Sequence, residues 1–264
     1  MLRHDFFKAA KVQRFYHFLQ YIFVKDWSFK TLHLCSKEIL FKLRISKNIN
    51  FIFMFYLKKI PGFVVKLFKD RVWRIDTNEK LLYLTFDDGP HPKATSFVLD
   101  ELKKINAKAT FFCVGKNVKE NFSLYERIIA EGHKVGNHTY SHLNGWKTDD
   151  KTYLNDIEKA SKIIDSHLFR PPYGKITKFQ LKAISGKRLN LTTIMWDVLS
   201  GDFDPSIDGK NCYLNVVNNA KPGSIIVLHD SAKAFATLQY ALPKVLEYFS
   251  GKGFKFRVLP DFNT

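Results

Sequence analysis

The sequence predicts an α/β protein whose parallel strands curl into a closed or nearly closed barrel. From residue 81 onward, short runs of apolar, β-branched and aromatic residues alternate with segments of helical periodicity. Strands that are continuously apolar and separated by helices are typical of a parallel sheet. Seven such strands with six helices between them favour a barrel over an open sheet. No glycine fingerprint follows the first strand, which argues against a dinucleotide-binding fold.

The predicted elements follow one another in a regular order. The strands are expected at residues 81–86, 108–114, 133–137, 167–170, 191–196, 224–228 and 254–259. The helices are expected at residues 93–106, 117–131, 149–166, 177–188, 208–220 and 234–250. In the second helix, Val118, Phe122 and Tyr125 recur at three- and four-residue steps, as one buried helix face requires. Gly132 follows at the position of a helix C-cap.

The first part of the chain differs from the rest in charge. The whole sequence has a formal net charge of +17, and residues 1–76 contain 16 Lys or Arg against 5 Asp or Glu. We therefore expect residues 1–53 to form a basic, aromatic extension outside a barrel at residues 54–264, with the motifs within 78–262. Weak docking on an anionic membrane surface is one role open to this extension, and packing against the barrel is the other.

Several classes of protein are disfavoured by what the sequence lacks. No nucleic-acid-binding signature accompanies the positive charge, so we expect no nucleic-acid partner. The sequence has no run of 18 apolar residues and no clear signal peptide, which favours a cytoplasmic or membrane-peripheral location. The sequence has three cysteines, and no two of them form a C-x-x-C pair. Neither a disulfide framework nor a zinc ribbon is therefore expected.

Ionisable residues follow five of the predicted strands. The sequences at these strand ends are TFDDGP at 85–90, HTYSH at 138–142, RPPYG at 170–174, SGDF at 200–203 and LHD at 228–230. In α/β barrels the catalytic groups lie at the C-terminal ends of the strands. A purely structural barrel would rarely place so many ionisable groups there, so the sequence predicts an active site on that face.

Two of these strand ends suggest a metal site. His138 and His142 are four residues apart, so on a helical turn both imidazoles would point the same way. Two histidines and one carboxylate bind a divalent metal and leave positions open, as in catalytic zinc sites. Taken singly, the histidines could be an ordinary surface pair, and Asp87-Asp88-Gly89-Pro90 an ordinary turn. Together they predict that one aspartate binds the metal while its neighbour accepts a proton from water.

The five motifs, in this order, resemble those of the polysaccharide deacetylases (carbohydrate esterase family 4) over residues 75–262. The resemblance implies a distorted (β/α)7 barrel. It also implies a metal-dependent hydrolase that removes N-acetyl or O-acetyl groups from an acetylated carbohydrate, with peptidoglycan and chitin oligosaccharides both open as substrates. One divalent cation is implied, and we expect it to be Zn²⁺.

The resemblance also assigns roles to individual residues. By motif position, Asp87 would be the catalytic base that activates water, and Arg170 the residue that holds the base carboxylate. The metal ligands would be Asp88, His138 and His142.

The remaining roles concern the acid and the substrate. His229 would be the general acid, oriented and tuned by Asp202. The backbone N–H of Tyr173 would help to bind the oxyanion. The substrate contacts are expected from Phe203, Leu228, Pro172 and Trp146, with the first two as apolar walls against the acetyl methyl group.

The sequence departs from the family pattern at its fourth motif. Phe203 stands where the family has a larger aromatic residue, and Leu199 stands where it has another acid. This departure bears on the subclass of substrate and not on the reaction. Two other readings stay open: a catalytically silent carbohydrate-binding barrel, and a non-haem iron enzyme, because two histidines and one carboxylate also form that facial triad.

Overall fold

A computed structural model describes residues 57–262 of the chain. The prediction that residues 1–53 form a basic extension with a membrane-facing role falls outside these residues and stays a prediction. Among the described helices, none combines the length and the apolar character that crossing a membrane requires.

The described strands form a single parallel sheet in the order β5-β4-β3-β2-β1-β7-β6, with β8 beside β1. Their bounds are β1 Leu81–Asp87, β2 Thr110–Cys113, β3 Lys134–Asn137, β4 Leu168–Phe169, β5 Thr192–Thr193, β6 Val198–Leu199, β7 Ile225–His229 and β8 Lys255–Phe256. The sheet curls into a distorted (β/α)7 barrel, which confirms the predicted fold class. All seven predicted strands are present, whereas β6 was not predicted.

The barrel is incomplete between its edge strands β5 and β6, and residues 58–76 lie along this opening. Lys59 forms a bridge to Val198 of β6, and Val72 forms one to Ile194, the residue after β5. The Lys59 ammonium also lies 2.7 Å from the Asp197 carboxylate. An edge strand exposes unpaired backbone groups, so this segment covers two edges that would otherwise be open. It includes a short helix that was not predicted, α2 (Gly62–Leu67).

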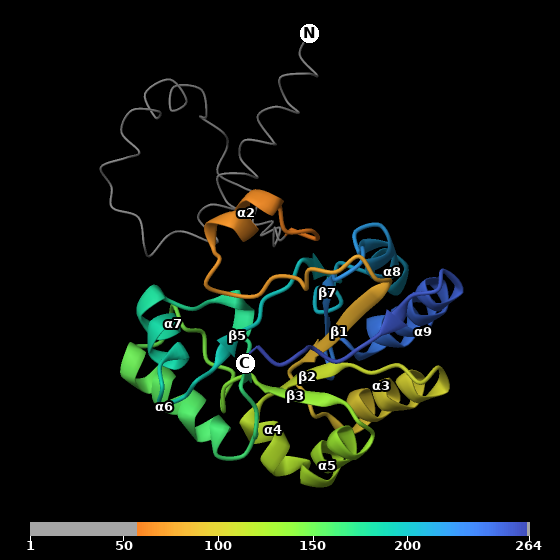
Figure 1. The fold of residues 1–264 in the computed structure, drawn as a ribbon. Coiled ribbons are helices and arrows are strands. Elements are labelled where there is room, and N and C mark those ends of the chain that lie inside the picture. The colour runs from red at the N-terminus through yellow and green to blue at the C-terminus, as the bar shows by residue number, and fades with distance from the viewer. Residues whose placement is uncertain (1–56, 263–264) are drawn as a thin grey trace, which may run out of the picture. The chain divides into compact units, whose positions relative to one another are not determined.

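The other helices surround the strands on the outside of the barrel (Figure 1). They are α3 Pro92–Lys104, α4 Gly115–Glu120, α5 Phe122–Ala130, α6 Asp150–Ser161, α7 Lys178–Ser185, α8 Gly209–Val217 and α9 Phe235–Gly251. The single helix predicted at 117–131 is in fact two helices. Asn121 separates α4 from α5 because its φ of −131° is not helical, although its N–H still bonds to the carbonyl of Asn117.

Successive side chains of β1 point alternately toward the surrounding helices and toward the barrel interior. Leu82, Leu84 and Phe86 belong to the main apolar core that the sheet forms with the surrounding helices. Successive residues of a strand point to opposite faces, so Thr85 and Asp87 point into the barrel. A buried strand thus presents a carboxylate to the barrel interior at its C-terminal end, which is where the candidate site lies.

Candidate active site

Asp87 is held by a buried arginine from the other side of the barrel. Arg170, which follows β4, donates from Nη1 to Asp87 Oδ1 at 2.6 Å. The guanidinium is fully buried and the carboxylate is nearly so. Charge-assisted hydrogen bonds of this length fix orientation as well as charge. The predicted contact between these two residues is therefore present.

The rest of the guanidinium is also satisfied. Arg170 donates to the Thr85 hydroxyl at 2.7 Å and to the carbonyl oxygens of Ile194 and Met195 at 3.2 and 2.9 Å. Its Cζ lies 4.1 Å from the centre of the Phe112 ring, so an aromatic face covers the cation. These contacts hold the guanidinium of Arg170 in one orientation. Arg170 therefore holds the Asp87 carboxylate in a fixed position as well.

Asp88, His138 and His142 converge at the next position along the same edge. One ligand atom from each lies within 4.8 Å of the other two. The Nε2 atoms of His142 and His138 are 3.1 and 3.6 Å from Asp88 Oδ1. Within the described residues this is the cluster whose donor atoms could hold a metal ion.

The two histidines meet through a loop and not through a helical turn, so that part of the prediction was wrong. Thr139 and His142 have φ values of 63° and 56°, in the left-handed region that interrupts a helix. The loop is held from outside because the Asp156 carboxylate accepts hydrogen bonds from the N–H groups of Tyr140 and Ser141, both at 2.9 Å. The predicted convergence is correct, but irregular backbone produces it.

The protonation of the cluster fits a metal. His138 Nδ1 lies 2.7 Å from the Arg170 carbonyl oxygen, which only a protonated Nδ1 can satisfy, and this leaves Nε2 with a lone pair aimed at Asp88. Burial lowers the pKa of His138 to about 4, so its imidazole is neutral at pH 7. Burial alone would raise the pKa of Asp88, but the contact with His142 and the positive charge of His229 hold this pKa below its ordinary value.

Asp88 also has a buried atom that needs a partner. Its Oδ1 accepts no hydrogen bond with good geometry, although it faces both imidazoles. A buried oxygen without a hydrogen bond is costly and rare in folded proteins. A cation between Asp88, His138 and His142 would satisfy it, so the donor set fits a divalent metal ion.

His229, at the end of β7, forms a pair with Asp202. Its Nδ1 lies 2.8 Å from Asp202 Oδ1, and its backbone N–H donates to Asp202 Oδ2 at 2.6 Å. Ser200 Oγ also donates to the same carboxylate, at 3.0 Å. Burial alone would lower the pKa of His229, but the Asp202 carboxylate raises it to about 10. His229 is thus a charged imidazolium at neutral pH and can donate a proton.

The register of the sheet places this acid opposite the buried carboxylate. Asp87 and His229 are direct partners on the neighbouring strands β1 and β7. Parallel partners in register point to the same face, and neighbouring strands lie about 4.8 Å apart. A proton acceptor and a proton donor therefore stand side by side, next to a cluster able to bind a metal.

Three of the four residues expected to contact substrate lie around this site or beside its loops. The Phe203 ring centre is 5.1 Å from that of His229. Pro172 is buried in the turn after Arg170. Trp146 is partly exposed, donates to the Ile176 carbonyl at 3.1 Å and has the Lys175 ammonium 3.9 Å from its ring centre. Its ring therefore packs against the neighbouring loop.

Leu228 does not fit its predicted role. It is fully buried in the main core, beside its register partner Phe86, which belongs to the same core. Both side chains point toward the helices, because alternation along β7 sends His229 to one face and Leu228 to the other. Val227, two residues before His229, is on the face of the barrel interior.

Tyr173, whose backbone N–H is expected to bind the oxyanion, lies in the turn that follows Arg170. It sits in a 3-10 turn (Pro172–Gly174) with a φ of 59°, and its ring centre is 4.8 Å from that of His142. About half of the side chain is exposed. A non-glycine residue in this conformation is uncommon and turns its backbone away from the regular direction.

Sequence reasoning missed a structural role for Asp230 and Thr95. Asp230 is fully buried and accepts hydrogen bonds from the Gly89 N–H at 3.1 Å and the Thr95 hydroxyl at 2.5 Å. Its own N–H donates to the Asp87 carbonyl at 3.1 Å. Burial raises the pKa of Asp230 to about 8. The LHD motif contains this residue, but only the structure shows that it supports the turn with both aspartates.

The chain is similar to known proteins both in sequence and in structure. The family model described as polysaccharide deacetylase matches residues 74–192. A peptidoglycan-N-acetylglucosamine deacetylase of Bacillus cereus is 36% identical over 190 residues, which are 70% of this chain and 88% of that protein. A chitooligosaccharide deacetylase of Azorhizobium caulinodans is 32% identical over 71% of this chain and 96% of its own. The crystal structure of the Bc1960 peptidoglycan N-acetylglucosamine deacetylase superposes with a TM-score of 0.69 at 34% identity, covering 74% of this chain and 94% of that one.

Proposed function

The chain belongs to the polysaccharide deacetylase family, and from this premise we propose that it hydrolyses the N-acetyl groups of an N-acetylglucosamine-containing glycan. The observation that carries the proposal is the pairing of Asp87 and His229 across β1 and β7, next to Asp88, His138 and His142. A base, an acid and a metal-binding cluster are the groups that amide hydrolysis needs.

In this proposal Asp87 and His229 transfer the protons, and their neighbours bind the acetyl group. Asp87, oriented by Arg170, accepts a proton from the attacking water, and His229 donates a proton to the leaving amine. The backbone N–H of Tyr173 donates to the oxyanion that forms on the acetyl carbonyl. Phe203, beside His229, covers the acetyl methyl group.

Asp88, His138 and His142 would hold one divalent cation in this proposal. Such a cation supplies Lewis acidity, which polarises the acetyl carbonyl and makes the attacking water more acidic. Two imidazoles and one carboxylate are the donors of many catalytic zinc sites, so we propose Zn²⁺. The non-haem iron reading uses the same three ligands but gives no role to Asp87, Arg170 or His229.

Release of acetate from a panel of acetylated saccharides tests the function. The panel contains N-acetylglucosamine oligomers, peptidoglycan and acetylated xylan, each with metal-stripped protein and after addition of Zn²⁺ or Fe²⁺. Zinc-dependent release from the N-acetylated members is expected, together with its loss in Asp87→Asn. Saccharide binding without acetate release under any metal would instead favour the silent carbohydrate-binding barrel.

A further inference from the structure

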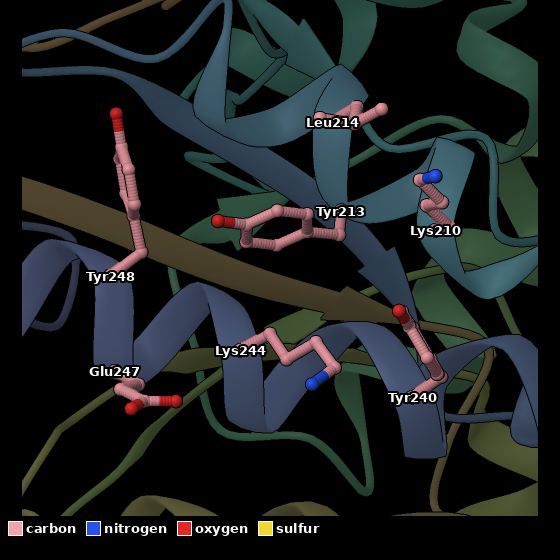
Figure 2. A pocket seen from close by; sticks show the side chains of 7 residues that line it. All are labelled: Lys210, Tyr213, Leu214, Tyr240, Lys244, Glu247 and Tyr248. Atoms are coloured by element: carbon pink, nitrogen blue, oxygen red, sulfur yellow. The ribbon is translucent and has the colours of Figure 1, made fainter.

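A groove lined by tyrosines and lysines runs between helices α8 and α9 on the outside of the barrel (Figure 2). Its volume is about 460 Å³. The groove is lined by Lys210 and Tyr213 from α8 and by Tyr240, Lys244, Glu247 and Tyr248 from α9. None of them takes part in the candidate active site.

The aromatic rings of the groove present both faces and edges. Tyr213 and Tyr248 are perpendicular, at 88°, with ring centres 6.2 Å apart. Lys252 donates to the Tyr248 hydroxyl at 2.6 Å, which holds that ring in place. Tyr240 is 46% exposed, the largest exposed aromatic surface in the groove. The rings are therefore partly fixed, but they keep surface available for a ligand.

The polar groups of the groove carry both signs of charge. Lys210 and Lys244 are exposed and Glu247 lies on the same helix as Lys244. The Lys244 ammonium is 5.0 Å from the centre of the Tyr240 ring. The groove thus combines ring surfaces with hydrogen-bond donors and an acceptor, without the single strong charge that a polyanion site would need.

The groove starts at the edge of the barrel that carries the candidate active site. α8 begins six residues after Phe203, and α9 begins six residues after His229. The start of α8 packs against the second turn of α9, because a Cβ added to Gly209 would lie 2.5 Å from the Cβ of Tyr240. At 1.5 Å per residue, Tyr240 and Tyr248 are separated by about 12 Å along α9.

We propose that this groove binds a stretch of N-acetylated glycan outside the catalytic site, a proposal that rests on the proposed function for the identity of the glycan. A pyranose ring has an apolar C–H face that packs on an aromatic ring and a rim of hydroxyl and amide groups. Tyrosine rings with lysine and glutamate side chains match both parts. The length of about 12 Å along α9 suits about two sugar rings. A polymer that enters from the catalytic edge can occupy both sites.

The experiment measures binding by NMR, without turnover, in the Asp87→Asn protein. Resonances of Tyr213, Tyr240 and Tyr248 are followed while an N-acetylglucosamine hexamer or dimer is added. The proposal expects these tyrosines to shift with the hexamer. Tyr240→Ala should weaken hexamer binding about three- to tenfold, the range of one aromatic contact, and should leave dimer binding at the catalytic site unchanged.

Lys210→Ala provides a second variant that leaves the rings intact, and a milder loss of hexamer binding is expected. Phe122→Ala is the matched control, because Phe122 is 52% exposed on α5, outside the groove. Shifts confined to His142 and Phe203 would overturn the groove proposal and leave the deacetylase proposal intact. Tyrosine shifts with an anionic polysaccharide but not with the neutral hexamer would overturn the ligand class. No shift in either region would overturn both.

Discussion

The carboxylate of Asp230 accepts a hydrogen bond from the Gly89 N–H at 3.1 Å, and this bond ties the end of β7 to the turn that holds Asp87 and Asp88. The tie is reciprocal, because the Asp230 N–H donates to the Asp87 carbonyl. A Cβ on Gly89 would fall 2.0 Å from Asp230 Oδ2, so only glycine fits there. Asp88, next in the turn, has a φ of 80°, and this contact supports that strained conformation.

Asp230→Ala should destabilise the protein and weaken metal binding. It leaves the buried Gly89 N–H and Thr95 hydroxyl without their acceptor, and each such loss costs about 1–3 kcal/mol. Thermal unfolding and zinc titration calorimetry measure the two effects. Asp230→Asn keeps an oxygen acceptor for Gly89 and should be milder in both. Equal zinc affinity in Asp230→Ala and in the unaltered protein would show that the turn holds Asp88 without this support.

Arg170→Lys should lose both stability and activity. A lysine cannot reproduce the bonds to Asp87, Thr85 and the two carbonyls, so the buried Asp87 carboxylate loses its partner. Removing one member of a buried ion pair costs about 3–5 kcal/mol. The control is Arg188→Lys, whose side chain is 76% exposed and pairs with Glu158 at the surface. Chemical denaturation of both variants should show a large loss only for Arg170→Lys, and similar losses would contradict its structural role.

Asp87→Asn and Asp88→Asn should have different effects on zinc binding and on acetate release. Asp87→Asn keeps the oxygen that accepts from Arg170, so zinc binding and folding should persist while acetate release falls by about 10²–10⁴-fold. Asp88→Asn replaces a charged ligand and should lower zinc affinity sharply, as should His138→Ala and His142→Ala. Zinc titration calorimetry measures the affinity of each variant for the metal, and acetate release measures its activity. The opposite pattern would mean that the two aspartates exchange roles.

Much of this site could be predicted from the sequence because its residues lie at the C-terminal ends of strands or directly after them. Asp87, Asp88, Arg170 and His229 follow runs of buried apolar residues, and parallel strands bring their C-terminal ends to one edge. Charged motifs at strand ends could therefore be placed together without a structure. Strand β6 (Val198–Leu199) was not predicted because it follows β5 after only four residues, with no helix between them to mark a new strand.

The features that the sequence missed depend on tertiary contacts. His142 reaches Asp88 through a loop with left-handed residues, and Asp156 of the next helix, α6, stabilises that loop through a contact that no motif in the sequence indicates. The error at Leu228 was avoidable, because alternation from His229 already places Leu228 on the opposite face. The role of Asp230 could not be inferred, because its partners Gly89 and Thr95 are more than 130 residues away in the sequence.

His229 should titrate far above an ordinary histidine. Its folded pKa of about 10 exceeds the ordinary value of 6.5, so charged His229 contributes stability that is complete below about pH 6.5 and is lost as the pH rises through about 10. NMR of the metal-free protein should show this titration; a bound cation would lower the pKa by repulsion. In Asp202→Asn the largest raising charge is gone while burial and the weaker effects of Asp88 and Asp87 remain, so the pKa of His229 should fall well below 10. An unchanged titration in Asp202→Asn would exclude Asp202 as its cause.

Truncated chains should locate the boundary between the barrel and the residues before it. A chain that begins at Met54 should fold and remain active, because the motifs and the described strands all lie after it. A chain that begins at Asp76 should not, because it lacks the segment that bridges Val198 and Ile194 on the two edge strands. It also leaves Asp197 buried without the Lys59 ammonium, and an unpaired buried carboxylate is costly.

Thermal unfolding, size-exclusion chromatography and acetate release should therefore rank the full chain and the Met54 chain together, well above the Asp76 chain. Exposed edges of β5 and β6 are also sites for strand pairing between molecules, so the Asp76 chain should aggregate on concentration. If the Met54 chain aggregates as well, residues 1–53 are part of the folded core and not an extension. If the Asp76 chain melts cooperatively and is active, the barrel closes without its covering segment, and the role of residues 58–75 has to be sought elsewhere.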